Sequence, residues 1–375
     1  MRVCMVTLQF PPNKVQGQVG GISIHTYELA KRLSPKVELH IITSAYPNLS
    51  KLEKENDYII HRLNHFPPNI IGNSGLLDIS FSKAVKNQID KLRPDLVHIQ
   101  EPHLTFFPIS YPLISTSHGI YMDEIKFAAH LTKFGCFVRI PLEFIGLHRS
   151  DWVTTVSEYM KKELIRKYLI HNISVIPNGV DLEILNPGKI DGASIVEKYG
   201  SNLVLYVGRL SKEKGIITLL KSAKLLPDVT FLLVGAGIRW KGYINSIKKL
   251  NNVKCIGFMP FNRLVEYYAA SDVFVHPGLY EAFGLTVLEA MAMEKPIIAS
   301  NIGGLAEVLG DTGLLFTPFD YIDLSKKIKK LLNDRELANA LSKRARKRAL
   351  NFDWSITAEK TLQLYENILE GKEPI

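Results

Sequence analysis

Two glutamates with seven residues between them are the feature of this sequence best suited to chemistry: Glu281 and Glu289 flank the segment Ala-Phe-Gly-Leu-Thr-Val-Leu. Gly284 and Leu285 fall where a loop enters a predicted helix, and the unpaired backbone N–H groups of a helix N-terminus favour phosphate. Thr286 adds a hydroxyl there. Carboxylates are poor ligands for phosphate but good acceptors for sugar hydroxyls. Because the flanking residues are apolar, two solvated glutamates are not the obvious interpretation.

A second loop carries basic residues. Arg209 follows a predicted strand, and Lys214 precedes a helix that begins near Gly215. An arginine presents a planar fork to phosphate and a lysine a mobile point charge. The pair could hold a diphosphate and neutralise it as a leaving group. The alternative is a solvated charged loop, which we prefer for Lys212 and Glu213.

Two loops in the first half of the chain are weaker candidates. Gly20 and Gly21 stand at the start of a predicted helix, where paired glycines let the backbone approach a ligand. His118 lies at the end of a predicted strand, from which it could bond a hydroxyl or a phosphate oxygen or move a proton. A flexible turn and a structural histidine are the respective alternatives, and both stay open.

Motifs for several other chemistries are absent. The sequence has no P-loop, no GxSxG, no HExxH and no EF-hand loop. The segment Val234–Gly237 has two of the three glycines of a dinucleotide-binding turn, because Trp240 takes the third place. No DxD triad offers a ligand pair for a metal-bound diphosphate. We therefore expect neither a metal nor a resident cofactor.

Short apolar strands alternate with amphipathic helices along the whole chain, which predicts an α/β fold with doubly wound parallel sheets. In the first half the predicted strands are Val3–Leu8, Val37–Thr43, Leu96–Gln100, Leu113–Ser117 and Trp152–Val156, with helices near Ser23–Leu33, Ser80–Leu92 and Ser157–Tyr168. In the second half they are Leu203–Val207, Thr230–Val234, Val253–Gly257, Val273–Val275 and Pro296–Ala299, with helices near Ile217–Leu226, Ile244–Leu250, Arg263–Ala269 and Leu285–Ala292.

The length of 375 residues suggests two domains. The turn-rich stretch from Pro177 onward, which includes Asn186–Ser194, places the boundary between residues 180 and 181, with a final helix at 355–375. Three scattered cysteines (Cys4, Cys136 and Cys255) fit buried thiols in a reducing cytosol. The apolar N-terminal segment is too short for a secretory signal, and no apolar run is long enough to span a membrane.

The sequence also resembles a known family, the retaining nucleotide-sugar glycosyltransferases of family 4 (glycosyl transferases group 1), which have the GT-B fold. The matching stretches span nearly the whole chain: GGISIHTYELAKRL, STSHG, TVSEYMKKEL, IPNGVD, LYVGRLSKEKG, FLLVGAG, IGFMP, HPGLYEAFGLTVLEAMAMEKPIIASNIGGLAEVLGDTGLLF and FDWSITAEKTLQLY. The resemblance implies two Rossmann-like domains facing across a cleft. Residues 1–180, with the returning helix 355–375, would form the acceptor side, and residues 181–354 the donor domain.

The resemblance implies a role for each candidate. Arg209 and Lys214 match a basic pair on the donor diphosphate, Glu289 the acid that binds the ribose, and Glu281 the acid that holds hydroxyls of the transferred sugar. Other matches concern the donor and the reacting sugar: the backbone of Phe283, Gly284 and Leu285, the base-contacting loop with Phe258 and Met259, the diphosphate loop with Gly20 and Gly21, and His118 beside the sugar.

The implied activity is metal-independent transfer of a hexose, with retention, from a nucleotide-diphosphate sugar to a hydroxyl of a lipid, a glycan or a small molecule, as in cell-envelope or glycan biosynthesis. The leaving phosphate oxygen would take the acceptor proton, and Glu281 as a covalent nucleophile is the chemical alternative. A nucleotide-sugar epimerase and a non-catalytic binding protein are the other classes. The sequence names neither the sugar, the base, the acceptor nor the oligomeric state.

The net charge is +9, from 46 basic and 37 acidic residues, with a pI of about 9.2. Lys326–Arg348 alone has ten basic and two acidic side chains. This run is either two solvated helical faces or a surface that docks on anionic lipid at the inner face of a membrane. The mixture of phenylalanines and basic residues in Ile125–Arg149 allows the same two interpretations. No aromatic residue lies within Lys326–Arg348, so we expect no nucleic-acid partner.

Overall fold

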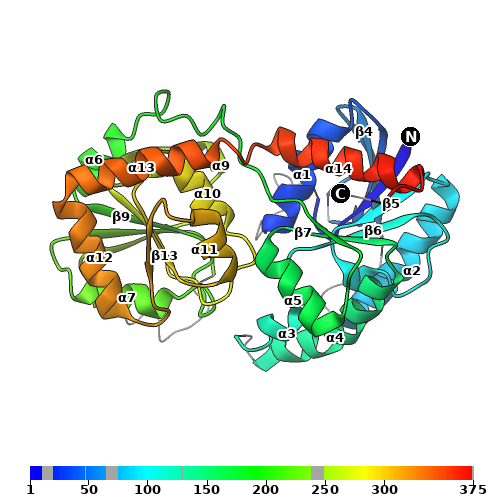
Figure 1. Ribbon diagram of the computed structural model, residues 1–375, viewed down its shortest axis with the longest axis horizontal. Coiled ribbons are helices and arrows are strands. Elements are labelled where there is room, and N and C mark those ends of the chain that lie inside the picture. Colours follow the sequence, from blue (N-terminus) through cyan, green and yellow to red (C-terminus); the bar gives the residue numbers. More distant parts are fainter. Residues whose placement is uncertain (11–19, 47, 65–74, 128–129, 238–248, 374–375) are drawn as a thin grey trace. The chain divides into compact units, whose positions relative to one another are not determined.

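The chain forms two compact units. The computed structural model describes residues 1–10, 20–46, 48–64, 75–127, 130–237 and 249–373. Unit 1 comprises Met1–Asn178 with Trp354–Ile375, and unit 2 comprises Gly179–Asp353. Each has a parallel sheet between layers of helices (Figure 1). The predicted α/β fold with two Rossmann-like domains is confirmed.

The sheet of unit 1 has the strand order β3-β4-β2-β1-β5-β6-β7-β8. Its strands are β1 (Arg2–Val6), β2 (Glu38–Ser44), β3 (Leu52–Glu55), β4 (Tyr58–Leu63), β5 (Leu96–Ile99), β6 (Leu113–Ser117), β7 (Trp152–Thr155) and β8 (Ile173–Val175). Among the strands that the structure describes, only β3 runs antiparallel to its neighbour, which the repeated βα pattern did not predict. Asn56 turns this hairpin with φ 51°, a left-handed conformation that asparagine tolerates.

Alternate residues of β1 pack on opposite faces of this sheet, as the two-residue period of a strand requires. Val3 and Met5 pack with α1 (Gly21–Leu33) and with α14 (Trp354–Leu369), the last helix of the chain. Cys4 and Val6 pack with α2 (Gly75–Leu92) on the other face. The other helices of the unit are η1 (Pro102–Leu104), α3 (Tyr121–Glu124), α4 (His130–Arg149) and α5 (Glu158–Tyr168).

The sheet of unit 2 is parallel throughout, in the order β11-β10-β9-β12-β13-β14. Its strands are β9 (Leu203–Val207), β10 (Thr230–Val234), β11 (Val253–Gly257), β12 (Val273–His276), β13 (Ile297–Ser300) and β14 (Leu314–Phe316). The helices around them are α6 (Ala193–Tyr199), α7 (Ile216–Lys224), α9 (Phe261–Ala270), α10 (Leu285–Ala292), α11 (Gly303–Leu309), α12 (Tyr321–Asn333) and α13 (Arg335–Ala349). Most of the helix predicted at Ile244–Leu250 lies outside the described residues.

One prediction about the cysteines is wrong. Cys4 and Cys136 are buried, but Cys255 is exposed. Cys255 lies on β11, which is the outermost strand of its sheet and has the exposed neighbour Lys254. An apolar strand pattern therefore did not ensure burial, because an edge strand is covered on fewer sides than a central one.

The strand order reverses at one place in each sheet. In unit 2 the chain builds outward from β9 through β10 to β11 and then places β12 on the other side of β9. In unit 1 the corresponding reversal lies between β1 and β5. Open α/β sheets bind ligands beyond the carboxyl ends of the strands at such a switch point. The loops after these four strands are therefore the places to look for a site.

The two loops at the switch point of unit 2 are in direct contact. Gly215 has φ 70°, and a Cβ atom there would lie 1.7 Å from the carbonyl oxygen of Pro277. Leu279 N donates a hydrogen bond of 2.8 Å to the carbonyl oxygen of Glu213. The loop after β9 is thus fixed against the loop after β12, at a spacing that only glycine permits.

Replacement of this glycine tests how strongly the contact constrains unit 2. Gly200 also has a positive φ, 83°, but a Cβ atom there would meet nothing within 4 Å, so Gly200→Ala is the matched control for backbone strain alone. We expect the control to cost about 1–2 kcal/mol. Gly215→Ala should cost roughly 2 kcal/mol more, because the Pro277 carbonyl must move. Equal decreases of the thermal unfolding midpoint in both variants would contradict this.

Candidate functional site

Lys214 and Glu281 form an ion pair at the switch point of unit 2. The Lys214 Nζ lies 2.5 Å from the Glu281 Oε2, and each side chain is 19% exposed. Burial acts to raise the pKa of Glu281, but the charge of Lys214, with His276 and the hydrogen bond from Lys214 acting in the same direction, outweighs it, and the pKa lies below its ordinary value. The carboxylate is therefore ionised. The sequence predicted both residues for the site, and the structure brings them together.

Arg209 is held much more loosely. Its side chain is 56% exposed, and its Nη2 lies 3.7 Å from the Oε1 of Glu213. The backbone is better fixed, because the hydroxyl of Tyr206 donates a 2.7 Å hydrogen bond to the carbonyl oxygen of Arg209. An exposed guanidinium on a fixed backbone is available to an anionic ligand at the end of β9.

Glu289 is the second carboxylate of the motif and lies in a different environment. It is buried on α10, and the hydroxyl of Tyr268 donates a 2.6 Å hydrogen bond to its Oε2. Burial raises its pKa to about 7, and the hydrogen bond from Tyr268 offsets only part of that rise. Near neutral pH this group can therefore either donate or accept a hydrogen bond.

The first turn of α10 presents its backbone at the same edge of the sheet. Gly284 caps the helix with φ 104° and supplies no side-chain cap, so the first N–H groups, those of Leu285 and Thr286, have no capping side chain. Phe283 is buried and lies edge-on to Phe352, with 6.0 Å between ring centroids. Its side chain is core, so only its backbone is available to a ligand.

Phe258 and Met259 follow β11, one strand beyond β10. Two strand spacings put their loop about 10 Å from the end of β9. Phe258 is 60% exposed. Their contact with a nucleotide base stays a prediction.

His118 lies in unit 1, immediately after β6. Its Nε2 is 3.0 Å from the Oε1 of Gln100, and its ring meets that of His25 edge-on, with 4.6 Å between centroids. Burial, with smaller contributions from His25 and His98, holds the pKa of His118 well below its ordinary value. The ring is therefore neutral, which suits a hydrogen-bonding role better than that of a fixed cation.

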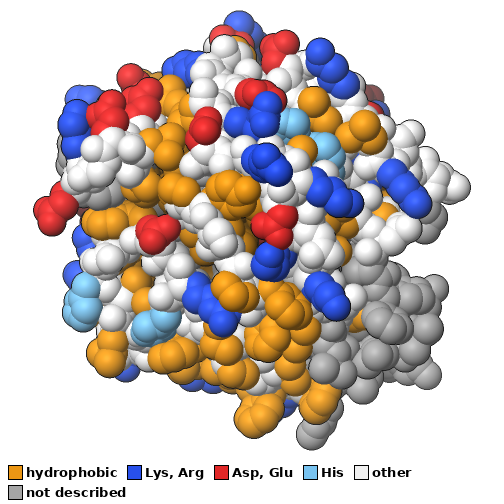
Figure 2. Space-filling model, turned by 90° about the vertical axis from the view of Figure 1, so that its right-hand side faces the viewer, with side chains coloured by type: hydrophobic (Ala, Val, Ile, Leu, Met, Phe, Trp, Pro, Cys, Tyr) orange, Lys and Arg blue, Asp and Glu red, His pale blue; other side chains and the backbone are white. Residues whose placement is uncertain are grey.

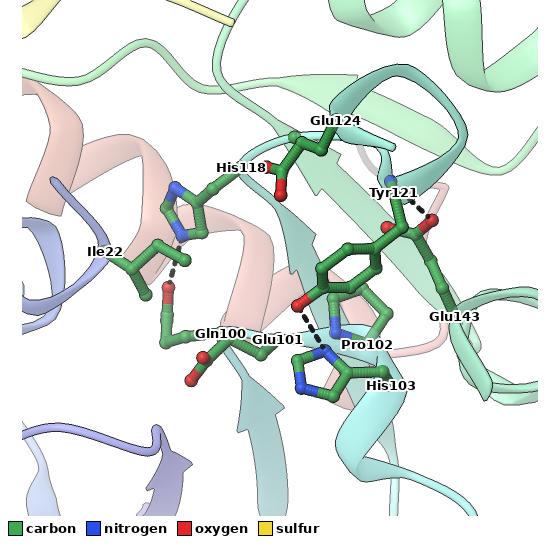
Figure 3. A pocket seen from close by; sticks show the side chains of 10 residues that line it. Ile22, Gln100, Glu101, Pro102, His103, His118, Tyr121, Glu124 and Glu143 are labelled. Carbon is green, nitrogen blue, oxygen red and sulfur yellow. Dashed lines mark hydrogen bonds between the residues drawn. The ribbon is translucent and has the colours of Figure 1, made fainter. Parts of the chain in front are cut away.

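Gly20 and Gly21 begin α1 on the same side of unit 1. Gly20 caps the helix with an ordinary φ of −93°, and a Cβ atom on it would meet no atom of the described residues within 4 Å. Neither backbone strain nor packing in the described part of the chain thus explains the glycine. Ile22, in the first turn of α1, lines one pocket together with His118 (Figure 3).

Several residues of these sites were not selected from the sequence. His276 ends β12, and its Nε2 lies 3.5 Å from the Oε2 of Glu281. Its position at the carboxyl end of a strand is the signal that identified His118 and could have identified it too. Gln100 and Glu101 follow β5 at the other switch point and carry the same signal. Tyr268, which bonds Glu289, lies within α9 and gave no signal.

The described part of the chain offers no candidate for a metal centre or for a membrane-spanning helix. Among the described residues, no group of three or more His, Cys, Asp or Glu side chains could hold a metal ion. Within the same residues, no helix is long and apolar enough to cross a membrane. Metal independence of the reaction stays a prediction.

Comparison with known proteins assigns a family to the chain. A family model described as "Glycosyl transferases group 1" matches residues 191–348, and one described as "Glycosyltransferase Family 4" matches residues 19–184. The chain is 30% identical, over 98% of its length and 99% of the relative's, to the uncharacterised glycosyltransferase MJ1178 of Methanocaldococcus jannaschii.

Solved structures show the same fold. Sucrose-phosphate synthase of Thermosynechococcus elongatus has a TM-score of 0.86 at 25% identity, covering 99% of this chain and 100% of that one. Anabaena HepE in complex with UDP-glucose has a TM-score of 0.76 at 20% identity, covering 99% and 100%. With both halves matched by glycosyltransferase family models, and with a full-length relative at 30% identity, the chain belongs to the glycosyl transferases of group 1 and has the GT-B fold.

Proposed function

We propose that this glycosyltransferase takes a hexose from a nucleotide-diphosphate sugar, bound on unit 2, and transfers it with retention to an acceptor hydroxyl without a metal ion. The observation that carries the proposal is the Lys214–Glu281 ion pair at the switch point. It sets a cation for a diphosphate next to a carboxylate for sugar hydroxyls. HepE, which has this fold, binds UDP-glucose, and a nucleotide sugar has both of these parts.

Charge stabilisation of the leaving group is the central step of the mechanism. The bond between the anomeric carbon and the phosphate oxygen breaks, and negative charge develops on the nucleoside diphosphate. Arg209, Lys214 and the N-terminus of α10 are the groups that stabilise this charge. The acceptor oxygen bonds to the anomeric carbon on the same face, and its proton passes to the leaving phosphate oxygen. No protein nucleophile is needed.

The environment of Glu281 favours hydrogen bonding over nucleophilic attack. Its Oε2 is engaged by Lys214, and its pKa lies below the ordinary value because Lys214 and His276 outweigh the effect of burial. A carboxylate stabilised in this way is a weaker nucleophile than an unpaired one. It can still accept hydrogen bonds from sugar hydroxyls through its second oxygen. Glu289, one turn into α10, is the group we assign to the ribose.

A surface for anionic lipid is the second part of the proposal. On α12 and α13 seven basic side chains are exposed: Lys326, Lys329, Lys330, Arg335, Lys343, Arg344 and Lys347. Not all of them are available, since Arg344 pairs with Asp311. Arg346 and Arg348 are used inside unit 2, where they donate to backbone carbonyl groups. The exposed lysines are the share that an anionic membrane would attract.

Unit 1 has a second feature that fits a membrane surface. Phe134, Phe137 and Phe144 on α4 are 62%, 68% and 46% exposed. Figure 2 shows the side of the molecule that lies on the right in Figure 1. Hydrophobic side chains gather in the lower part of this view, with basic side chains beside them. Exposed aromatic rings beside lysines such as Lys133 suit the interface between lipid headgroups and acyl chains.

The first test of the function is donor binding followed by transfer. The UDP, GDP or ADP sugar that raises the unfolding midpoint most is taken as donor, since a ligand at 100 times its Kd stabilises by about 2.7 kcal/mol. With that donor, Arg209→Ala and Lys214→Ala should each lower kcat/KM by about 10²-fold, because a charge contact in the transition state is lost. Lys212→Ala is the control, because Lys212 is an exposed lysine of the same loop to which we assign no role.

Two results would contradict the assignment. No stabilisation by any nucleotide sugar would count against the donor site, and near-normal transfer in both clamp variants would remove Arg209 and Lys214 from the mechanism. Conversion of the donor sugar without any acceptor would instead indicate an epimerase.

Glu289→Gln should change two measurable properties in opposite directions: it should increase stability at high pH and weaken donor binding. The native pKa of about 7 lies above the ordinary value, so folding favours the protonated form and stability is lost as pH rises from about 4.5 to 7. The amide has no such loss. The unfolding midpoint of the variant should therefore rise relative to wild type by about 2–4 °C between pH 5.5 and 8.5. The donor should also stabilise the variant less than it stabilises the wild type. If the difference in unfolding midpoint between variant and wild type does not depend on pH, the raised pKa of buried Glu289 is refuted.

Sedimentation with liposomes tests the lipid surface. Vesicles that contain phosphatidylglycerol should bind the protein at low salt, and phosphatidylcholine vesicles should not, because the attraction is electrostatic. Replacing Lys326, Lys329, Lys330 and Lys343 by glutamine should weaken binding by several-fold or more, at about 1 kcal/mol for each lysine near the surface. A triple change of Phe134, Phe137 and Phe144 to serine tests α4 separately. If the wild-type protein stays in the supernatant with anionic vesicles at low salt, the proposed binding to anionic lipid is refuted.

A further inference from the structure

A pocket in unit 1 lies where β5 and β6 end, beside the first turn of α1. It has a volume of about 350 Å³ when the space open to solvent is included. Figure 3 shows the side chains that carry its chemistry: Gln100, Glu101, His103, His118, Tyr121 and Glu143. All of them come from unit 1, at the edge of the sheet where the strand order reverses. This position is where an α/β sheet binds a ligand.

Among the described residues that line the pocket there are three carboxyl groups, those of Glu101, Glu124 and Glu143, and no lysine or arginine. Two basic side chains near the pocket are already paired with other carboxylates. Arg139 donates a 2.6 Å hydrogen bond to Asp78, and Lys167 pairs with Asp123. Burial raises the pKa of Glu143 to about 8, so this carboxyl group is largely protonated near neutral pH. A phosphate or carboxylate in this pocket would therefore give up its water without gaining a compensating cation from the described lining residues. An uncharged, hydroxyl-rich group would meet hydrogen-bond acceptors.

Glu101 is fixed at the switch point. Its Oε2 accepts hydrogen bonds from the backbone N–H of Leu8, at 2.8 Å, and from the hydroxyl of Thr7, at 3.2 Å. Both hydrogen bonds end on Oε2, so they fix the orientation of the carboxyl group. Oε1 can therefore still accept a hydrogen bond from a ligand. Burial raises the pKa of Glu101 to about 7, although the Leu8 N–H acts against that rise. A carboxyl group of this kind suits a hydroxyl partner better than an anion.

The remaining polar groups of the pocket are neutral and oriented. The Nε2 of Gln100 lies 3.3 Å from the Nε2 of His98, which turns the amide oxygen toward His118 at 3.0 Å. With its Nε2–H donated to Gln100, neutral His118 keeps Nδ1 as an acceptor. The hydroxyl of Tyr121 lies 3.4 Å from the Nδ1 of His103. Fixed neutral donors and acceptors around a carboxyl group are the chemistry that recognises a polyol.

We propose that this pocket selects an acceptor whose reacting part is an uncharged sugar ring, and that Glu101 accepts a hydrogen bond from one of its hydroxyls. The inference rests on the proposed function, because it names the acceptor class of that reaction. Glu101 is a specificity-determining residue, because its carboxyl group orients the neutral ring. A phosphorylated acceptor is disfavoured, because the described lining residues offer it no cation and Glu124 adds an exposed carboxyl group.

The test compares uncharged acceptors with matched anionic ones. Methyl glycosides of glucose, galactose, mannose and N-acetylglucosamine are assayed beside their 6-phosphates, with the donor identified by thermal shift. We expect transfer to at least one neutral glycoside and at least tenfold lower kcat/KM for its 6-phosphate. Glu101→Gln should raise the KM for the neutral acceptor by about tenfold and narrow the discrimination against the phosphate. Donor-induced stabilisation shows that the variant is folded.

Two further variants complete the experiment. Glu359→Gln, on the exposed side of α14, removes a carboxylate away from the pocket and should leave selectivity unchanged. Glu124→Gln removes the exposed carboxylate of the pocket and should narrow the discrimination against phosphate even if Glu101→Gln does not fold.

The outcomes separate this inference from the proposed function. Preference of the wild-type enzyme for a 6-phosphate, or no transfer to any neutral glycoside while donor binding is intact, overturns the inference alone. The inference is also overturned if neither Glu101→Gln nor Glu124→Gln changes the selectivity between neutral and phosphorylated acceptors. Absence of both donor binding and donor cleavage overturns the proposed function instead.

Discussion

The close approach of Gly215 to the carbonyl of Pro277 is the constraint on which the candidate site at the switch point of unit 2 depends. A Cβ atom there would lie 1.7 Å from that oxygen, so the loops after β9 and β12 can meet only at a residue without a side chain. Their contact brings Lys214 to 2.5 Å from Glu281, although the two residues are far apart in the sequence. The parallel sheet places both loops at the same edge, and the glycine lets their backbones come into contact because it has no Cβ atom.

The two glutamates of the motif differ in protonation because their local environments differ, although their side chains are identical. Glu281 lies beside Lys214 and His276, and the charge of Lys214 is the main factor that outweighs burial and keeps its pKa below the ordinary value. Glu289 has only the hydroxyl of Tyr268 as partner, and burial raises its pKa to about 7. One carboxyl group is thus a fixed anion within an ion pair, while the other can change its protonation state near neutral pH. Opposite shifts in paired acids of this kind are typical of functional sites.

The sequence predicted the fold class and the loops that carry the sites, because apolar periodicity and glycines at strand ends are local signals. It did not predict the pairings. Tyr268 bonds Glu289 from α9 only after α9 packs beside α10, and no spacing along the chain reveals that contact. His276 and Glu101 were missed for a different reason. Both carry the signal of a polar residue at a strand end, but neither is followed directly by a glycine, and His276 was not singled out although it begins the stretch that contains Glu281 and Glu289. The edge position of β11, which exposes Cys255, is likewise a property of the sheet order and not of the strand.

The net charge of +9 illustrates the same difference between composition and structure. Arg348 donates to the carbonyl oxygens of Glu307 and Val308 at the C-terminal end of α11, and Arg346 donates to that of Ala292, the last residue of α10. These side chains stabilise helix ends, where cations are favoured and backbone acceptors have no partner within the helix. Unit 1 uses Arg139 in another way, as the partner of buried Asp78. In unit 2 Arg209 is exposed and only loosely paired, whereas the described residues that line the unit 1 pocket include no lysine or arginine. The way in which charged side chains are paired therefore decides where a cation stays available to a ligand, which net charge alone does not reveal.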